Sequence, residues 1–530
     1  MFLTAELGRT ISDSDYDQEV PAMREALLTA QQRVRHAPFP VIILFGGVDG
    51  AGKSETINLL NAWMDPRWLM TRAYAEPSEE MRERPEFWRY WRDLPPKGRI
   101  ALFQSSWYSQ PILDRVYERT SEAEFEEALE RVASFEKENA DDGALIMKFW
   151  MHLGKDAQET RFKELETDPL TRWRVQTADW EHWKKYDQFV AAAERAIMRT
   201  SNVGTPWHIV EGFDENYRSL TTAKIILESI DQHFEKVDIQ REVEAALKAR
   251  DGKKKKKNKK SKKSKDHPAT RSTAEADAED QFASTGLIPN TSPKTILSQL
   301  DMSLSLGKSE YAKLLEEHQG ALNKQARKAK DLGISTILVF EGWDAAGKGG
   351  SIRRVVAALD ARGLQVIPIA APSDEELAHH YLWRFWRHLS RAGRITIFDR
   401  SWYGRVLVER IEGYATETEW KRAYNEINDF EDQLVRHGIV LCKFWMHITK
   451  DEQLKRFKER EKTTYKRWKL TEDDWRNRDR WDQYEHAVND MVERTSTVHA
   501  PWTLVEANDK RFARIKVLET ITSQLKARLD

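Results

Sequence analysis

The stretch Ser335-Thr-Ile-Leu-Val-Phe340 is followed, one residue later, by Gly342-Trp-Asp-Ala-Ala-Gly347-Lys348-Gly349. The apolar run is typical of a β-strand buried on both faces. The pattern G-x-x-x-x-G-K after it is that of a phosphate-binding loop, in which glycines let backbone N–H groups turn toward a phosphate and the lysine adds a positive charge. The helix that follows offers its positive N-terminus. This stretch therefore predicts a strand, a phosphate-binding loop and a helix.

The same arrangement occurs near the N-terminus, where Val41-Ile-Ile-Leu-Phe45 precedes Gly47-Val-Asp-Gly-Ala-Gly52-Lys53-Ser54. Lys53 and Lys348 lie 295 positions apart. The same offset joins pairs of tryptophans: Trp88 and Trp383, Trp107 and Trp402, Trp150 and Trp445, Trp173 and Trp468, Trp207 and Trp502. Because this period is far too long for a solenoid repeat, it indicates a tandem duplication of one domain.

Further short apolar segments recur with this offset: 100–103 and 395–398, 144–149 and 439–444, 208–210 and 503–505. Helical patterns separate them, beginning with 16–35 in the first half and 311–330 in the second. Strands that alternate with helices predict an α/β fold in which helices cover both faces of a parallel sheet. Ligands should bind at the carboxyl ends of the strands. We predict one such domain at 1–235 and another at 298–530.

A lysine-rich segment separates the two halves. Residues 251–265 are mostly lysine, and a stretch rich in Thr, Ala, Glu and Asp continues to about residue 292. Because apolar residues are nearly absent, no packed core can offset the entropy of ordering, and we predict a disordered linker at 236–297. The lysines act either as a solvated spacer or as a tether for polyanions such as polyphosphate or RNA.

Composition limits the environment of the chain. The formal net charge is −1, and without the ten lysines between Lys253 and Lys265 it would be −11. An anion site must therefore be a local concentration of Lys and Arg. The single cysteine, Cys442, excludes a disulfide framework and fits a reducing compartment. With neither a secretory signal nor an apolar stretch long enough to cross a membrane, we expect a cytoplasmic protein without a membrane partner.

The segment after the next strand distinguishes the two halves. The second half has Phe398-Asp399-Arg400-Ser401-Trp402-Tyr403-Gly404-Arg405, and the first has Phe103-Gln-Ser-Ser-Trp-Tyr-Ser-Gln110. The aromatic frame persists, whereas one carboxylate and two guanidinium groups are lost. Phosphoryl transfer depends on neutralising the charge of the moving group, so we expect the first half to be catalytically poor. The alternative is that Asp399 and Arg400 form a buried ion pair with a structural role only.

The residue after the loop lysine concerns metal binding. A Ser or Thr at this position normally helps to hold Mg²⁺. The first half has Ser54 there and the second has Gly349, so a metal in the second half needs other ligands. Asp344 and Asp399 are the available carboxylates, and hard oxygen ligands suit Mg²⁺.

A cationic segment, Lys462-Thr-Thr-Tyr-Lys466-Arg467-Trp468-Lys469, falls where a kinase-like fold places a flexible lid. The first half keeps only Arg172 and Arg174 at matching positions. A cationic lid suits a highly charged phosphate chain, and the alternative is a solvated helix end.

Other aromatic and histidine positions are shared by both halves. His152 and His447 could act as acid or base groups, but a packing or hydrogen-bonding role is favoured, because transfer to a phosphate needs no strong base. The tryptophans at 88, 91, 383 and 386 recur at helical spacing and are expected in the core rather than as platforms that stack on a nucleotide.

Together the loop at Gly342–Gly349, the segment Asp399–Arg405 and the lid at Lys462–Lys469 resemble the polyphosphate kinase 2 family. The two-copy layout resembles its class II members, the polyphosphate:AMP phosphotransferases, and Gly349 after the loop lysine is itself typical of the family. The resemblance covers nearly all of both halves but not the linker. It implies a P-loop kinase α/β/α sandwich similar to thymidylate kinase, with a helical lid, in each half. It also implies that Mg²⁺ supports transfer from inorganic polyphosphate to a nucleotide.

The resemblance further implies roles for individual residues of the C-terminal half. Asp344 orients or activates the acceptor phosphate and, with Asp399, holds the metal. Arg400 and Arg405 stabilise the charge that builds between donor and acceptor. The residues expected to bind phosphates are Gly342, Ala346, Gly347, Lys348, Gly349, Gly350, Lys462, Lys466, Arg467 and Lys469.

We therefore expect phosphorylation of AMP to ADP with polyphosphate as the donor. The alternatives are phosphorylation of ADP to ATP by polyphosphate, an ATP-dependent nucleoside monophosphate kinase, and a non-catalytic polyanion-binding protein. No specific nucleic acid partner is expected. Fused members of the family suggest further assembly into a homo-oligomer.

Overall fold

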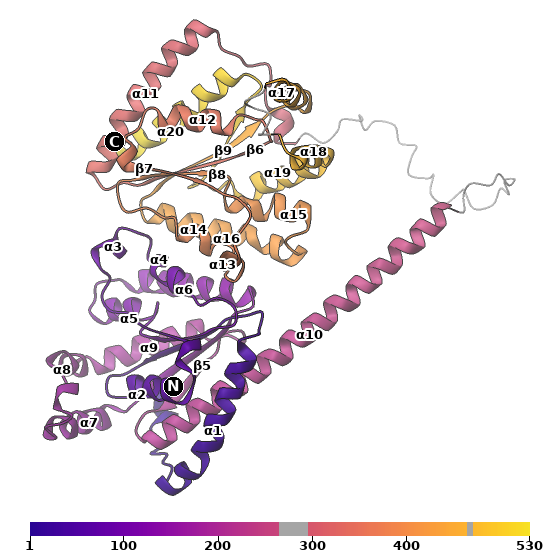
Figure 1. Ribbon diagram of the computed structural model, residues 1–530. Coiled ribbons are helices and arrows are strands. Elements are labelled where there is room, and N and C mark those ends of the chain that lie inside the picture. The colour runs from indigo at the N-terminus through magenta and orange to yellow at the C-terminus, as the bar shows by residue number, and fades with distance from the viewer. Residues whose placement is uncertain (264–294, 464–469) are drawn as a thin grey trace, which may run out of the picture. The chain divides into compact units, whose positions relative to one another are not determined.

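A computed structural model describes residues 1–263, 295–463 and 470–530 of the chain (Figure 1). Met1–Thr222 and Thr295–Asp530 form one compact unit, and a second unit begins at Ala223. Within the first unit each half of the chain builds its own five-stranded sheet. The predicted α/β architecture with two related parallel sheets is confirmed.

The N-terminal sheet has the strand order β2-β3-β1-β4-β5, and every neighbouring pair is parallel. Its strands are β1 (Val41–Gly47), β2 (Leu69–Ala73), β3 (Ile100–Gln104), β4 (Leu145–His152) and β5 (Trp207–Glu211). Its helices are α1 (Asp13–Val34), α2 (Lys53–Trp63), α3 (Glu79–Arg82), α4 (Trp88–Asp93), α5 (Ser109–Val116), α6 (Glu122–Asp141), α7 (Lys155–Thr167), α8 (Thr177–Lys184), α9 (Tyr186–Thr200) and α10 (Glu215–Lys263), with 3-10 turns η1 (Phe2–Ala5), η2 (Pro66–Trp68) and η3 (Arg172–Arg174).

The C-terminal sheet repeats this order as β7-β8-β6-β9-β10, again with parallel neighbours. Its strands are β6 (Thr336–Gly342), β7 (Leu364–Pro368), β8 (Ile395–Asp399), β9 (Val440–His447) and β10 (Trp502–Glu506). Its helices are α11 (Lys308–Asp331), α12 (Lys348–Val356), α13 (Asp374–Leu377), α14 (Trp383–Trp386), α15 (Val408–Glu412), α16 (Glu417–Arg436), α17 (Lys450–Lys462), α18 (Glu472–Asp479), α19 (Trp481–Thr495) and α20 (Lys510–Leu529), with 3-10 turns η4 (Leu297–Gln299), η5 (Ala361–Gly363) and η6 (Trp402–Arg405).

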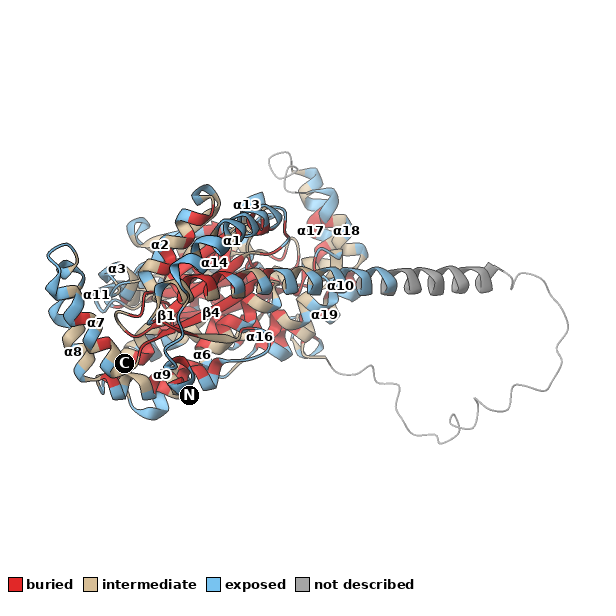
Figure 2. Cartoon of the chain, turned by 90° about the horizontal axis from the view of Figure 1, so that it is seen from below, coloured by how far each residue is buried: buried red, intermediate tan, exposed pale blue. Residues whose placement is uncertain are grey.

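The central strands form the core of each half. All eight residues of β4 (red in Figure 2) and of β9 are buried, because helices cover both faces of each sheet. Burial on both faces explains the continuous apolar runs from which these strands were predicted. The two outer strands β2 and β7 were missed by the sequence analysis. They lie at sheet edges and are mostly exposed or half-buried, so they lack the long apolar run that marks the central strands.

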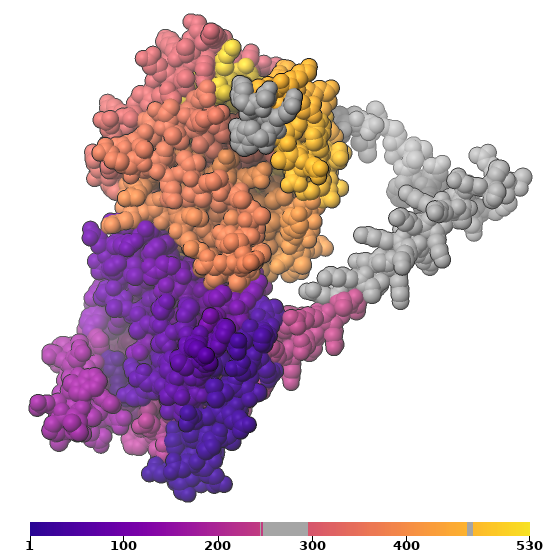
Figure 3. Space-filling model, viewed as in Figure 1, coloured from indigo at the N-terminus to yellow at the C-terminus, as the bar shows by residue number. Residues whose placement is uncertain are grey.

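The two halves contact each other (Figure 3), and some of the contacts join equivalent residues. The indoles of Trp91 and Trp386, which differ by the repeat offset, stack with ring centroids 5.8 Å apart. Ser134 Oγ donates to Asp429 Oδ2 at 2.6 Å, across the same separation of 295 residues. Contacts between equivalent positions are the signature of an approximate twofold relation, as in an isologous dimer. The predicted core role of these tryptophans is confirmed, since both are buried.

The predicted linker at 236–297 differs in part from the structure. Helix α10 continues through residue 263, so residues 236–263 are helical rather than disordered. Their Glu, Ala, Lys and Arg content explains the helix, since these residues favour helices even without a core to pack against. Residues 264–294 lie outside the described part of the chain. Within the described ranges, every helix is too short or too polar to cross a lipid bilayer.

Candidate active site

The phosphate-binding loop of the C-terminal half joins the central strand β6 to α12. Gly342 has φ +146°, and a Cβ there would lie 2.5 Å from the carbonyl oxygen of Met446, so only glycine fits. Gly347 caps α12 in the left-handed region with φ +113°. Ala346 and Gly347 thus precede the helix N-terminus, and Gly349 and Gly350 lie in its first turn, where free backbone N–H groups favour an anion. Lys348 Nζ donates to the carbonyls of Gly342 at 2.7 Å and Trp343 at 3.3 Å.

Arg456, which the sequence analysis missed, holds this loop through its backbone carbonyls. Arg456 of α17 is 3% exposed. Its guanidinium group donates to the carbonyls of Ala345, Ala346, Ala507 and Asn508 at 2.7–3.0 Å. It therefore ties the loop to the segment after β10. Nothing in the sequence separates Arg456 from the other basic residues of its helix.

Asp399 ends β8, the neighbour of β6, and so lies at the same edge of the sheet as the loop. Among the residues that the structure describes, its carboxylate has no hydrogen-bond or ion-pair partner. Arg400 has a left-handed backbone (φ +66°) and its N–H donates to the carbonyl of Phe340. Its guanidinium lies 3.5 Å from Asp344 Oδ1 and is 57% exposed. The structure therefore pairs Arg400 with Asp344 across the loop, and the alternative of a buried Asp399–Arg400 ion pair is wrong.

Arg405 has different neighbours from those of Arg400. Its guanidinium carbon lies 4.5 Å from the ring centroid of Tyr381, and its Nε lies 3.2 Å from Glu409 Oε2. The structure pairs it with none of the loop residues. Arg405 is nevertheless held on the turn η6 that begins three residues after Asp399.

Glu341 is a second residue that the sequence analysis missed. It is the second-last residue of β6, is buried, and accepts a hydrogen bond of 2.8 Å from Ser401 Oγ. Burial raises the pKa of its carboxyl, and the positive charges of Lys348 and Arg400 oppose this. The corresponding residue of the N-terminal half is Gly46. That replacement was visible in the sequence as an acidic residue at the end of an apolar strand.

The predicted lid lies only partly within the described structure. Lys462 is the last residue of α17, and Lys466, Arg467 and Lys469 lie outside the described residues. The next helix, α18, does reach the site, because Asn477 Nδ2 donates to Asp344 Oδ2 at 2.9 Å.

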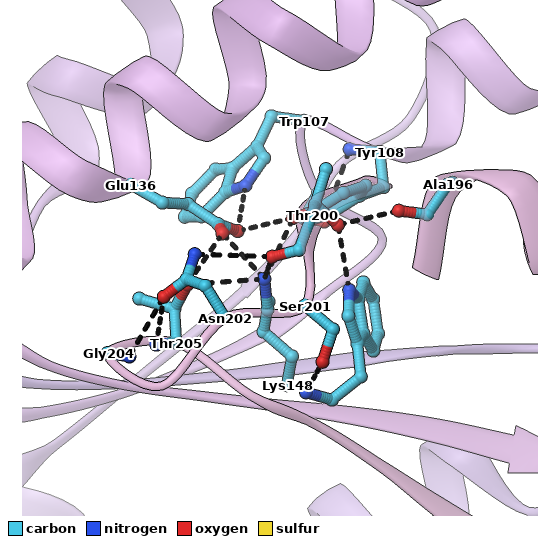
Figure 4. A network of polar contacts seen from close by, with 12 residues as sticks. Trp107, Tyr108, Glu136, Lys148, Ala196, Thr200, Ser201, Asn202, Gly204 and Thr205 are labelled. Atoms are coloured by element: carbon cyan, nitrogen blue, oxygen red, sulfur yellow. Dashed lines mark hydrogen bonds and ion pairs between the residues drawn. The ribbon is translucent and has the colours of Figure 1, made fainter. Parts of the chain in front are cut away.

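A buried polar network anchors the turn that carries these side chains. Lys443 Nζ on β9 lies 2.7 Å from Glu431 Oε2, and both side chains are almost fully buried. Glu431 also accepts hydrogen bonds from Trp402 Nε1 at 3.0 Å and Tyr403 OH at 2.6 Å. The N-terminal half has the same network around Lys148 and Glu136 (Figure 4). This explains why the Trp-Tyr pair persists in both halves.

Replacing Glu431 by Ala should destabilise the C-terminal half by about 3–5 kcal/mol, because it leaves the Lys443 ammonium buried without a counter-charge. Urea unfolding monitored by tryptophan fluorescence measures the change. The matched control is Glu417→Ala on the same helix, where the partner Lys421 is exposed and the unfolding midpoint should not move. Equal midpoints for Glu431→Ala and Glu417→Ala would contradict the anchoring role.

His447 at the end of β9 has a hydrogen-bonding role. It is buried, and its Nδ1 accepts from Trp343 Nε1 at 3.2 Å and from Trp445 Nε1 at 3.4 Å. An imidazole that accepts in this way is neutral. Burial lowers its pKa to about 4.

The neutral His447 predicts a pH dependence of stability. The unfolded histidine has a pKa of about 6.5, so between pH 6.5 and 4 the unfolded chain binds the extra proton. Stability is therefore lost as the pH falls through this window, by about 2 kcal/mol from pH 7 to pH 5 for this one group. Urea unfolding of the wild-type chain and of His447→Gln at both pH values tests this. The variant should lose less stability than the wild type, and equal losses would contradict the assignment.

The corresponding strand end of the N-terminal half carries neutral side chains, Gln104 and Ser105. Gln104 stands where Asp399 stands, and its Nε2 donates to Ser54 Oγ at 2.9 Å. Asp49 accepts from His182 at 2.8 Å and lies 3.4 Å from Lys53 Nζ. Burial opposes ionisation of Asp49, but Lys53 and His182 outweigh it and hold its pKa below the usual range. Asp49, Asp179 and His182 also form the only group of three potential metal ligands among the described residues.

The chain is similar to several known proteins. Residues 10–238 and 305–530 match the polyphosphate kinase 2 (PPK2) family. The polyphosphate:AMP phosphotransferase of Pseudomonas aeruginosa is 48% identical over 528 residues, which cover 99% of each chain. That of Pseudomonas syringae pv. tomato is 46% identical over 527 residues, covering 99% of this chain and 98% of the relative. A crystal structure described as polyphosphate kinase 2 from P. aeruginosa PA01 superposes with a TM-score of 0.83 and 46% identity, covering 100% of this chain and 99% of that one.

Proposed function

The chain belongs to the polyphosphate kinase 2 family, and from this premise we propose that its C-terminal half transfers a phosphoryl group from inorganic polyphosphate to AMP, giving ADP. We assign the reaction to the C-terminal half because the two halves carry different residues at the end of one strand. Asp399 and Arg400 in the C-terminal half correspond to Gln104 and Ser105 in the N-terminal half, although both turns are held by the same buried network.

In the proposed reaction an oxygen of the AMP phosphate attacks the terminal phosphorus of polyphosphate. The bond from that phosphorus to its bridging oxygen breaks, and the shortened polyphosphate leaves with this oxygen. Lys348 and the backbone N–H groups at the start of α12 cradle the donor phosphates. Arg400, which is exposed beside Asp344, is proposed to neutralise charge between donor and acceptor.

Two carboxylates are proposed to hold a divalent metal. Asp399 has no partner within residues 1–263, 295–463 and 470–530, and Asp344 Oδ1 has only the 3.5 Å contact with Arg400. Two hard carboxylates near a phosphate loop suit Mg²⁺, and Asp344 and Asp399 would hold it there. When bound, the metal would neutralise phosphate oxygens during the transfer. Arg405 and the lid cations Lys462, Lys466, Arg467 and Lys469 are proposed to close over the phosphates.

We also propose that the protein works in the cytoplasm. The single cysteine, Cys442, is buried and free, and burial raises the pKa of its thiol to about 12. Such a chain fits the reducing cytoplasm.

We further propose that the chain assembles into a homo-oligomer in solution, which sedimentation at several protein concentrations tests.

An assay without ATP tests the reaction. The full chain is incubated with Mg²⁺, polyphosphate and one acceptor at a time: AMP, ADP, GMP or GDP. ADP formed from AMP supports the proposal, and ATP formed only from ADP would replace AMP as the acceptor. Product that forms only after ATP is added as the donor would make the chain a nucleoside monophosphate kinase. Retention on immobilised polyphosphate without any turnover would overturn the enzymatic assignment of this half.

A further inference from the structure

The N-terminal half contains a cavity of about 210 Å³ at the carboxyl edge of its sheet. It lies between the loop after β1 and the helices α5 and α9, and its lining is mostly apolar. Aromatic side chains form much of the wall: Tyr108, Trp150, Tyr186, Phe189 and Trp207. Asp49, Lys53 and His182 line it as well, so the phosphate-binding loop of this half forms one side of the cavity.

The equivalent place in the C-terminal half is filled by protein. There Trp343 and Trp481 stack with ring centroids 3.7 Å apart and an interplanar angle of 6°. Their counterparts at the repeat offset are the smaller residues Val48 and Tyr186, both of which line the cavity. The counterpart of Glu341 is Gly46, which leaves the ring of Trp150 open to the cavity. At all three positions the side chain of the N-terminal half is smaller than its counterpart in the C-terminal half, and the space that this leaves forms the cavity.

Two buried polar atoms in the wall of this cavity have no hydrogen-bond partner among the described residues. They are the N–H of Trp150 and the side-chain carbonyl of Gln158, and both residues are 2% exposed. Their counterparts in the C-terminal half are satisfied, since Trp445 donates to His447 and Gln453 Oε1 accepts from Arg478. A buried polar group without a partner is uncommon in a native protein. The wall of the cavity therefore offers one free donor and one free acceptor to a ligand.

We propose that this cavity binds a nucleotide that does not react, with the aromatic base in the cavity and the phosphate at the Lys53 loop. The aromatic walls suit a planar ring, and the free donor and acceptor suit the polar edge of a base. The loop and Lys53 suit the phosphate. Polyphosphate is excluded from the cavity itself, because apolar walls cannot replace the hydration of a polyanion. The proposal does not depend on which acceptor the C-terminal half uses.

The test is the number of nucleotides bound per chain. Equilibrium dialysis of the full-length chain with labelled AMP, ADP, GMP or GDP, without polyphosphate, gives this number. The variant Val48→Trp/Tyr186→Trp restores the residues of the filled C-terminal site. For at least one nucleotide the number bound should fall by one in the variant. Because the C-terminal site contributes equally to both proteins, its failure to bind would not hide this difference.

Two milder variants keep the test valid if the double variant does not fold. Trp150→Phe removes the free N–H and should weaken binding at this site about 3- to 10-fold, as expected for one hydrogen bond. Lys53→Ala should weaken binding of AMP but not of adenosine, which lacks the phosphate. The proposal is overturned if no nucleotide shows the second site, or if filling the cavity leaves the number of bound nucleotides unchanged.

Discussion

Asp399→Asn should lower kcat for phosphoryl transfer by about 1000-fold or more while the chain stays folded. The substitution keeps the shape of the side chain but removes a negative charge whose oxygens have no partner in the described structure. If these oxygens hold the divalent metal, their loss removes the charge that neutralises the migrating phosphoryl group. Steady-state kinetics with polyphosphate, AMP and a series of Mg²⁺ concentrations measures both kcat and the metal dependence.

The matched control for Asp399→Asn is Gln104→Asn, at the same strand position of the N-terminal half. This change should leave kcat within about twofold of the wild type, because the N-terminal strand end carries no charge in either form. A value for Asp399→Asn within tenfold of the wild type, with an unaltered Mg²⁺ dependence, would exclude Asp399 as a metal ligand.

Arg400→Ser should reduce kcat by about 10³- to 10⁵-fold, the range seen when an arginine that stabilises a phosphoryl transition state is removed. Serine is the residue that the N-terminal half carries here. Ser105 adopts φ +54° and Arg400 adopts φ +66°, so serine tolerates the left-handed backbone of this turn. The loss should therefore come from the missing charge rather than from a change in the backbone. It should appear mainly in kcat, because the charge develops in the transition state.

Arg362→Ser serves as the control for Arg400→Ser. Arg362 is 86% exposed, pairs with Asp360 and lies before the edge strand β7. Its removal should not change kcat. If Arg400→Ser raised KM for AMP and left kcat intact, Arg400 would bind the acceptor in the ground state only, and its proposed role in the transition state would be wrong.

The fold was largely predictable because the central strands are buried on both faces. The predicted segments at 41–45 and 395–398 lie inside the observed strands Val41–Gly47 and Ile395–Asp399. Edge strands such as β7 were not predictable in this way, because only Ile367 within it is buried. The helix through residue 263 was missed because a lysine-rich sequence lacks a hydrophobic pattern but keeps a high intrinsic helix propensity.

The site was predictable where the two halves differ in charge. The exchange of Asp399 for Gln104 could be read directly from the aligned halves. The contacts of Arg456 with the loop could not be predicted from the sequence. This arginine binds backbone carbonyls that are far apart in the sequence and are brought together only by the fold. The cavity of the N-terminal half depends on Val48, Tyr186 and Gly46, which are ordinary residues in the sequence and become informative only when placed together.

We propose that the C-terminal half alone carries out the transfer. The most direct test measures kcat with polyphosphate and AMP for two full-length variants, Lys348→Ala and Lys53→Ala. The two lysines occupy equivalent loop positions and make equivalent hydrogen bonds to the first loop carbonyl, each 2.7 Å long. We expect Lys348→Ala to lose at least 100-fold in kcat and Lys53→Ala to lose no more than threefold. Loss of activity in Lys53→Ala together with normal turnover in Lys348→Ala would contradict the claim.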